Sequence, residues 1–329
     1  MESYSGNAGG VNLQAGNVNI DGSATVGIAD ANVTGILADA FLGSGNSGHI
    51  QVAAANQITI FGGGEISSEA HALGNAGYII LQAGSLTIDG SACPTVFTGI
   101  TADATAGTGH AGDVQINVPG LLSILNSGEI SAKSAALGNA GNLDLQVGAL
   151  YIDGTATAST PQAFSTGILS DVAFGGGNAG SIQVTAADQI AIIGGGVISS
   201  SSKSLGSAGE VTLQAAGLII DGSASPTFFT GIATTSGSGG TGNGQVQITV
   251  AGLVSILGSG EITTSSNAVG NAQQRARPGS DSHPATACPG PAFAGRPHKA
   301  RFYQPAKQSL WRQQPVSGVP GPAQSAERL

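Results

Sequence analysis

Charged and aromatic residues are scarce in this sequence. Of its 329 residues, 9% are Asp, Glu, Lys or Arg, and 4% are Phe, Trp or Tyr. A globular enzyme of this length normally has about a quarter charged residues, so the composition is not that of a typical enzyme. The chain is nevertheless 40% hydrophobic, and disordered chains lack such apolar content. Together these values indicate an ordered, repetitive fold.

Basic residues are nearly absent from residues 1–272. This segment contains Lys133 and Lys203, no Arg and 17 acidic residues, which gives a formal charge of −15. Binding to nucleic acids depends on Lys and Arg side chains that neutralise phosphates. The sequence therefore predicts no nucleic-acid partner for this segment.

Cysteine and long apolar runs are also lacking. Cys93 and Cys288 are the only two cysteines, and they lie in regions of opposite charge, so no structural disulfide is expected. The sequence contains no run of about 18 apolar residues, so no transmembrane helix is expected. Residues 1–10 have neither a basic n-region nor an apolar h-region, so no signal peptide is expected there.

Glycine, in contrast, is abundant, with 54 residues, and much of it belongs to a repeated phrase. The phrase Gly-Asn-Ala-Gly-x-Val-x-Leu-Gln recurs imperfectly eight times, in alternating long and short repeats, and a ninth copy stops after Ala272. The copies begin at Gly6, Gly45, Gly74, Gly109, Gly138, Gly177, Gly206, Thr241 and Gly270. Because an internal period of roughly 20–50 residues indicates a solenoid or another array, residues 1–272 are predicted to form one repeat domain.

A longer period of 132 residues is superimposed on these repeats. The phrase SACPTVFTGI from Ser91 reappears as SASPTFFTGI from Ser223. Duplication lengthens a solenoid, whereas a single active site gains nothing from copies. The pattern favours a structural protein over an enzyme.

Each repeat alternates apolar and polar residues over short segments, as in residues 11–14 and 18–20 and around Ile36. A period of two with β-branched residues is typical of strands. Three short strands per coil would turn an apolar face inward, and stacked coils would share that face. We therefore expect an all-β chain, a parallel β-helix of about eight coils. One inner wall is predicted to contain Ile20, Ile88, Ile152 and Ile220.

Three tandem phrases carry a family resemblance: GNAG-x-V-x-L-Q, L-x-I-D-G-S and G-G-x-I-S-S. In an acidic, cysteine-poor chain they resemble the repeat region of filamentous-haemagglutinin-like exoproteins, over residues 5–272. The resemblance implies a right-handed parallel β-helix, two-partner secretion through an outer-membrane transporter, and an extracellular or cell-surface location. It also implies adhesion to glycans or proteins of host or bacterial cell surfaces. The family's amino-terminal secretion domain is not in this sequence, so a fragment of a longer exoprotein is expected.

The recurring Asn of the phrase is predicted to be structural. Coils stacked in register would align these residues at one corner, where their amides would bond along the stack, as Asn ladders do in cross-β assemblies. The residues are Asn7, Asn46, Asn75, Asn139, Asn178 and Asn243.

An Asp-Gly pair follows an apolar strand in each long repeat, at Asp21, Asp89, Asp153 and Asp221. Asp-Gly is a strong turn signal, so turns are predicted. The alternative is that these four carboxylates stack to bind cations, but the Gly-Gly-x-Gly-x-Asp nonapeptide of calcium-binding β-rolls is missing. No metal, cofactor or catalytic residue is expected.

Two other functions remain open from the sequence: a carbohydrate-active β-helix enzyme, either lyase or hydrolase, and an inert spacer. A hydrolase needs carboxylates that converge in a cleft, and the sequence offers Asp30 with Asp39, or Asp103 with Asp171, without a signal that pairs them. Similar lyases use Arg or Lys as base, and residues 1–272 have no Arg. The three His residues of residues 1–272, His49, His71 and His110, do not have the spacing of metal ligands.

Loops between the Asp-Gly pairs and the following Thr-Gly-Ile phrases carry aromatic residues. Their predicted role is to cover the adjacent coil, with ligand binding as the alternative, since loops on a rigid scaffold often carry binding sites. The residues are Phe97, Phe164, Phe228 and Phe229.

Residues 273–329 break the pattern, with nine of the 13 Pro, all six Arg and a formal charge of +6. This basic, Pro-rich tail is predicted to be disordered. A shifted reading frame is a further hypothesis, because residues 273–278 can be encoded so that the next frame reads Ser-Ser-Val-Arg-Val-Gln and restores the alternation. Since neither end of the repeat domain shows a cap, exposed strand edges predict end-to-end self-association.

Overall fold

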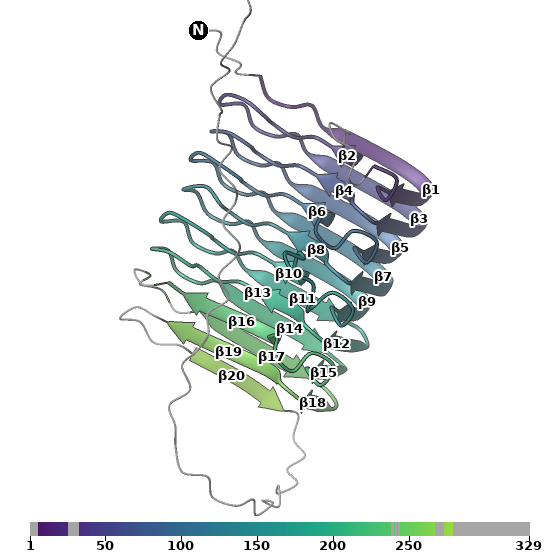
Figure 1. Ribbon diagram of the computed structural model, residues 1–329, viewed down its shortest axis with the longest axis vertical. Helices are drawn as coiled ribbons and strands as arrows, with labels where there is room; N and C mark the ends of the chain where they lie inside the picture. Colours follow the sequence, from purple (N-terminus) through teal and green to yellow (C-terminus); the bar gives the residue numbers. More distant parts are fainter. Residues whose placement is uncertain are drawn as a thin grey trace, which may run out of the picture. The chain divides into compact units, whose positions relative to one another are not determined.

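The computed structural model describes residues 6–25, 33–237, 240, 242 and 244–266, and the backbone of residues 273–278. Within these residues every regular element is a β-strand and none is a helix. The strands form two sheets, one of twelve strands and one of eight (Figure 1). The prediction of an all-β chain is confirmed.

The two sheets divide the strands as follows. The twelve-stranded sheet contains β1 (Val11–Asp21), β3 (Ile50–Phe61), β5 (Ile79–Asp89), β7 (Val114–Leu125), β9 (Leu143–Asp153), β11 (Ile182–Ala186), β12 (Gln189–Ile193), β14 (Glu210–Ala215), β15 (Gly217–Asp221), β17 (Gln245–Val250), β18 (Val254–Leu257) and β20 (Gln273–Pro278). The eight-stranded sheet contains β2 (Thr34–Leu37), β4 (Gly64–Ser67), β6 (Thr98–Thr101), β8 (Gly128–Ser131), β10 (Thr166–Leu169), β13 (Gly196–Ser199), β16 (Thr230–Ser236) and β19 (Gly260–Ser266).

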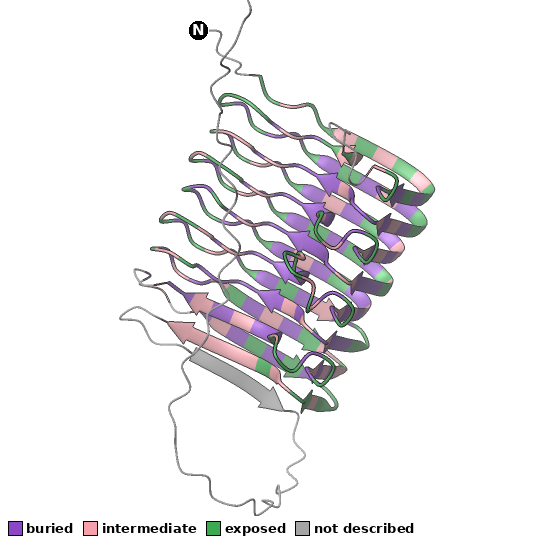
Figure 2. Ribbon diagram, viewed as in Figure 1, coloured by how far each residue is buried: buried purple, intermediate pink, exposed green. Residues whose placement is uncertain are grey.

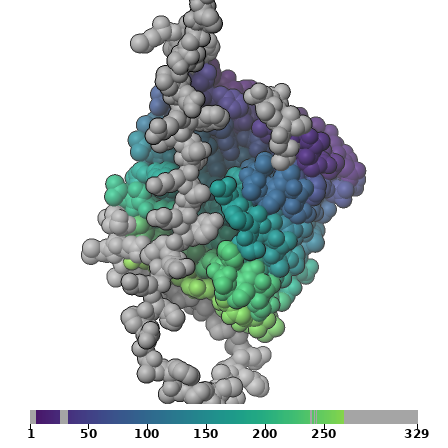
Figure 3. Space-filling model, in the orientation of Figure 1, coloured from purple at the N-terminus to yellow at the C-terminus, as the bar shows by residue number. Residues whose placement is uncertain are grey.

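All pairings between the described strands are parallel. Neighbours in each sheet are not consecutive in the chain: β1 pairs with β3 and β2 with β4. The chain therefore passes from one sheet to the other within each repeat and adds a strand to both. Layers follow one another in sequence order, as the colour bands of Figure 3 also show. This arrangement is consistent with a solenoid-like fold.

Equivalent residues of successive repeats lie in register. One row of paired residues runs along the twelve-stranded sheet through Ile20, Ile60, Ile88, Ile124, Ile152, Ile192, Ile220 and Ile256. Six of the eight, from Ile60 to Ile220, have no exposed surface at all. The predicted wall of Ile20, Ile88, Ile152 and Ile220 is thus confirmed.

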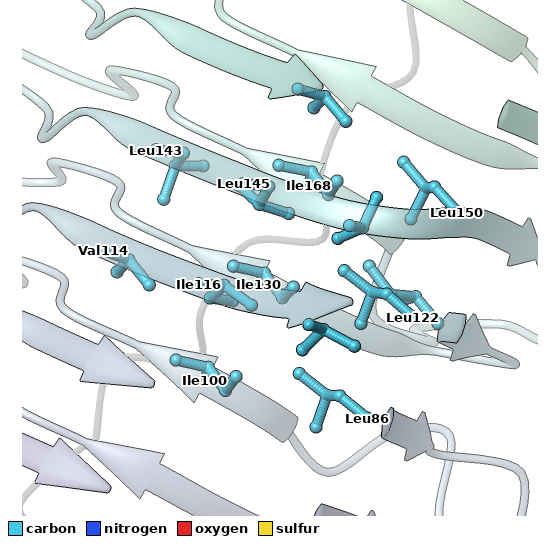
Figure 4. Packing of buried hydrophobic residues seen from close by; sticks show 14 of the residues in the cluster. Leu86, Ile100, Val114, Ile116, Leu122, Ile130, Leu143, Leu145, Leu150 and Ile168 are labelled. Atoms are coloured by element: carbon cyan, nitrogen blue, oxygen red, sulfur yellow. The ribbon is translucent and has the colours of Figure 1, made fainter. Parts of the chain in front are cut away.

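The core lies between the two sheets. Val114 and Ile116 of β7 and Leu145 of β9 point toward Ile130 of β8 and Ile168 of β10 (Figure 4). All five side chains are at most 1% exposed. Burial of one such side chain contributes about 1.5–3 kcal/mol. Because a single repeat has no layer above or below it, this stabilisation arises only when repeats stack.

The expectation of three separate strands per coil is wrong for most repeats. The first two alternating segments form one long strand, such as β1 or β3, with an irregularity in register between Ala15 and Asn17. A turn between the segments is missing because one extra residue in the partner strand is absorbed as a bulge, which bends a strand without ending it. The segments are separate strands only in later repeats, for example β11 and β12.

Glycine is required where the repeat phrase makes its corner. A Cβ atom on Gly141 would lie 1.9 Å from the carbonyl oxygen of Gly112 in the preceding repeat. Real Cβ atoms do not approach backbone so closely, so any larger residue would push two layers apart. The same close approach recurs at Gly77, Gly112, Gly180 and Gly209.

The two ends of the stack are less buried than its middle (Figure 2). Ile256, the last member of the isoleucine row, is 47% exposed, because β18 pairs only with β15 among the described strands. Strand β20 pairs with β17 and takes up the first six residues of the segment for which disorder is predicted. The rest of the predicted tail, from residue 279, lies outside the described residues, as does Cys288. Cys93 is a buried free thiol.

Candidate functional site

The four Asp-Gly pairs form turns, as predicted. In each, a carboxylate oxygen of the Asp accepts a hydrogen bond of 2.9–3.0 Å from the backbone N–H two residues later. This is the Asx-turn geometry expected of Asp at such a position. The hydroxyl and the backbone N–H of Ser23 hold the pKa of Asp21 below its ordinary value, and Ser223 does the same for Asp221. One oxygen of each of these carboxylates is therefore engaged in a hydrogen bond within its own turn.

The recurring Asn residues form the predicted ladder, but with a different donor. Each Asn Oδ1 accepts a hydrogen bond from the backbone N–H of the equivalent residue in the next repeat, at 2.8–2.9 Å. The amide-to-amide bonding that we expected is therefore wrong. A backbone N–H at a corner has no strand partner, so it takes the side-chain oxygen beneath it. Asn243 lies outside the described residues.

His110 continues this ladder in the place of an Asn. It donates its own N–H to Asn75 Oδ1 at 2.8 Å, and its Nδ1 accepts the N–H of Asn139 at 2.9 Å. Nδ1 must therefore be unprotonated, with the ring proton on Nε2.

Replacement of His110 by Asn is expected to leave the stability unchanged within about 0.5 kcal/mol, because Asn occupies this position in five other described repeats. Replacement by Ala removes the acceptor for Asn139 N–H and should cost about 1 kcal/mol. Chemical denaturation of the two variants measures the difference. Equal stability of both would show that the ladder does not contribute.

The other two His residues that the structure describes, His49 and His71, make separate contacts. The ring of His49 stacks on Tyr78 at 3.8 Å between centroids, and His71 stacks on Phe41 at 4.8 Å. His71 Nε2 also lies 3.4 Å from Glu69 Oε2. Among the described residues no group of three or more His, Cys, Asp and Glu side chains is placed to hold a metal ion.

Asp39, Asp103 and Asp171 make the same contacts in three long repeats. One oxygen of each accepts a Ser hydroxyl, at 2.5–2.7 Å, and a backbone N–H, at 2.6–2.7 Å, from the next short repeat. The hydroxyls belong to Ser67, Ser131 and Ser199. Asp103 and Asp171 thus each bond to a different short repeat, and Asp30 lies outside the described residues.

These aspartates belong to a larger row that sequence reasoning missed. Glu65, Glu69, Glu129 and Lys133 come from the short repeats, on β4 and β8 and just after them, and interleave with the aspartates along the eight-stranded sheet. We call the seven residues the carboxylate row: Asp39, Glu65, Glu69, Asp103, Glu129, Lys133 and Asp171. The row thus contains six carboxyl groups and one ammonium group.

Burial and repulsion between carboxylates raise the pKa values of Glu65 and Glu69 in this row. Burial, with the charge of Asp39, raises the pKa of Glu65 to about 7. Burial, followed by the charge of Asp103, raises that of Glu69 to about 8, although Glu69 Oε1 accepts the Thr101 hydroxyl at 2.7 Å. Near neutral pH these two groups can therefore carry a proton.

Lys133 lies in the middle of the row. Its Nζ is 2.5 Å from Glu129 Oε1, and Glu129 is 1% exposed. Burial raises the pKa of Glu129, while Lys133 acts in the opposite direction. The charges of Glu129 and Asp103 keep Lys133 protonated, with its pKa raised despite burial.

One sequence signal could have revealed this row. Gly35, Glu65, Gly99 and Glu129 are paired in one column across β2, β4, β6 and β8. A Cβ atom on Gly99 would lie 1.8 Å from the carbonyl oxygen of Glu129. The alternation of Gly with Glu thus leaves room beside each glutamate, and the phrase Gly-Glu-Ile-Ser repeats at the corresponding spacing.

The aromatic loops pack on one another across long repeats. The rings of Phe97 and Phe164 meet edge to face at 5.7 Å, and the N–H of Phe164 bonds to the carbonyl of Pro94 at 2.9 Å. This agrees with the predicted covering role. Phe229 is 37% exposed at the edge of its loop.

Comparison with protein-family models, with curated proteins and with solved structures finds no match to this chain. Among the described residues no helix is long and apolar enough to cross a membrane.

Proposed function

We propose that the stacked strands are the coils of a right-handed parallel β-helix of about eight coils, followed by a disordered tail. We further propose that the chain is a repeat fragment of a bacterial adhesin-like exoprotein, exported by the two-partner route to the cell surface. One observation carries the proposal: equivalent residues of successive repeats pair in register from β1 to β18. Such a stack can be lengthened without change and serves to display a surface.

The polar side chains of the stack support a structural role. The Asn ladder, the Asp-Gly turns and the three aspartates of the carboxylate row each bond to a backbone N–H of their own or the next repeat. The Asn ladder and the three aspartates join successive layers, and the Asp-Gly turns fix the conformation of their own loops. Adhesion would then depend on side chains that remain exposed at the corners.

A hydrolase is the second candidate, and the raised pKa values of Glu65 and Glu69 favour it, because a protonated carboxyl group is a possible general acid. Release of reducing ends from a panel of acidic and neutral polysaccharides tests this. Activity that is lost in Glu69→Gln would replace the adhesive proposal.

Beads coated with the full chain are expected to bind epithelial cells or bacterial cells above the level of albumin-coated beads. Soluble chain added in excess should compete, because binding to a surface receptor is saturable. Bead counts by flow cytometry measure both effects. Binding no higher than albumin on every cell type would favour the inert spacer, and a transporter gene beside the coding region would support the export route.

A further inference from the structure

One corner of the stack displays large apolar side chains to solvent. It is formed by the connections that lead from the eight-stranded sheet to the next strand of the twelve-stranded sheet, at the left of Figure 1. Leu73, Leu137 and Leu205 are 56%, 61% and 64% exposed, and Phe41 and Phe174 are 64% and 67% exposed. Scattered exposed leucines need no explanation, but these three leucines recur at one place in every second repeat. We call Phe41, Leu42, Leu73, Leu137, Phe174 and Leu205 the apolar corner.

Glycines separate the leucines of this corner. The N–H groups of Leu73, Leu137 and Leu205 bond at 3.0–3.1 Å to the carbonyls of Gly43, Gly107 and Gly175 in the preceding repeats. The three glycines have φ near +80°, which favours glycine strongly. The backbone thus explains the glycines but not the leucines. Equivalent positions of six successive repeats thus form a column in which glycine and leucine alternate: Gly43, Leu73, Gly107, Leu137, Gly175 and Leu205.

We infer that the apolar corner binds a second copy of this chain, side by side and antiparallel. Reversal of the column exchanges leucines and glycines, so every leucine of one copy meets a glycine of the other. Leu137 then faces Gly107, Leu73 faces Gly175, and Leu205 faces Gly43. The two-fold axis passes between the connections that hold Gly107 and Leu137. Leucines at every second layer are about 10 Å apart, a spacing that a second copy reproduces.

Charge complementarity selects the antiparallel direction. Lys203 is exposed and lies two residues before Leu205, as Phe41 lies two residues before Gly43. In the antiparallel pair, Lys203 of each copy therefore meets the ring of Phe41 and the nearby carboxylate of Asp39 in the other. Both contacts are favourable for a cation. In a parallel pair offset by one layer, the facing loops run in opposite directions, so Lys203 would lie opposite Gly177 instead. This interface goes beyond the proposed adhesive function and does not depend on it.

Sedimentation velocity of the full chain over a range of concentrations tests the inference. A monomer–dimer equilibrium is expected, and Leu137→Asn should weaken it at least tenfold, because the two-fold axis brings two copies of the substitution into the interface. The matched control is Leu121→Asn, a leucine that is 48% exposed at the bend of β7. It should change the dimer affinity less than twofold.

Two further variants separate this contact from others. Lys203→Glu should weaken the dimer at least threefold, while Ile256→Asn, at the open end of the stack, should leave it unchanged. Thermal melts establish that each variant is folded. The inference is overturned by a chain that stays monomeric at all concentrations, by equal effects of Leu137→Asn and Leu121→Asn, by a dimer that Lys203→Glu does not weaken, or by association that only Ile256→Asn abolishes.

Discussion

Replacement of Lys133 by Ser is expected to lower the free energy of unfolding by about 3 kcal/mol. The substitution removes the cation that lies 2.5 Å from Glu129 Oε1 and leaves a carboxyl group that is 1% exposed without its partner. Loss of one member of a buried pair typically costs about 3–5 kcal/mol. We expect the lower end of this range because the Lys133 side chain is 31% exposed. Urea unfolding followed by circular dichroism measures the loss.

The chain itself supplies the matched control. Val197 occupies the column position of Glu129 two layers further on, next to Gly167, and Ser201 takes the place of Lys133. The double variant Glu129→Val with Lys133→Ser should therefore come within about 1 kcal/mol of the original chain, since replacement of a buried pair by packed side chains is often neutral. A double variant as unstable as Lys133→Ser alone would show that the stranded carboxylate is not the cause.

Acidification from pH 9 to pH 5 is expected to stabilise the fold by a few kcal/mol. The pKa values of Glu65 and Glu69 are raised to about 7 and about 8, whereas an unfolded glutamate has its ordinary, lower value. The folded chain thus holds protons that the unfolded chain releases. The resulting stabilisation is complete below the unfolded pKa, near 4.5, and is lost as the pH rises through 7 and 8. Melting temperatures measured across this range test the sign.

Glu69→Gln isolates the contribution of Glu69 to this pH dependence. The amide is neutral at every pH and its oxygen can still accept the Thr101 hydroxyl. We expect the variant to be more stable than the original chain at pH 9, by about 1–3 kcal/mol, and nearly equal to it at pH 5. Glu210→Gln, at an exposed position of β14, is the control. A parent chain whose melting temperature rises with pH between 5 and 9 would contradict the assignment.

The sequence periodicity predicted the features that depend only on residues within one repeat. The isoleucine wall follows from alternation, and the turns at Asp21 and Asp89 follow from the Asp-Gly pair. Each of these depends on a few neighbouring residues and a known strand period. The alignment of the Asn corner was also predictable, because identical phrases at regular spacing must lie over one another in a stack.

The carboxylate row was not predicted because it is a property of columns, not of segments. Glu129 and Lys133 look like an ordinary exposed pair in the sequence, and only the register places them among Asp103, Glu69 and Asp171. The continuous, bent strands β1 and β3 were not predicted for a related reason. A Gly at the junction, such as Gly16 in β1, is normally a turn signal, but here the bulge at this point keeps the strand continuous.

The column in which Gly35, Glu65, Gly99 and Glu129 alternate has a consequence for how such a chain changes length. Deletion of one long repeat, such as the one that supplies Gly99, would bring two glutamates onto adjacent layers, and two leucines of the apolar corner onto adjacent layers as well. Deletion of a long and a short repeat together would restore every neighbour. The unit that can be duplicated or lost without disturbing its neighbours is therefore a pair of one long and one short repeat. Related chains of different length should differ by whole pairs of repeats.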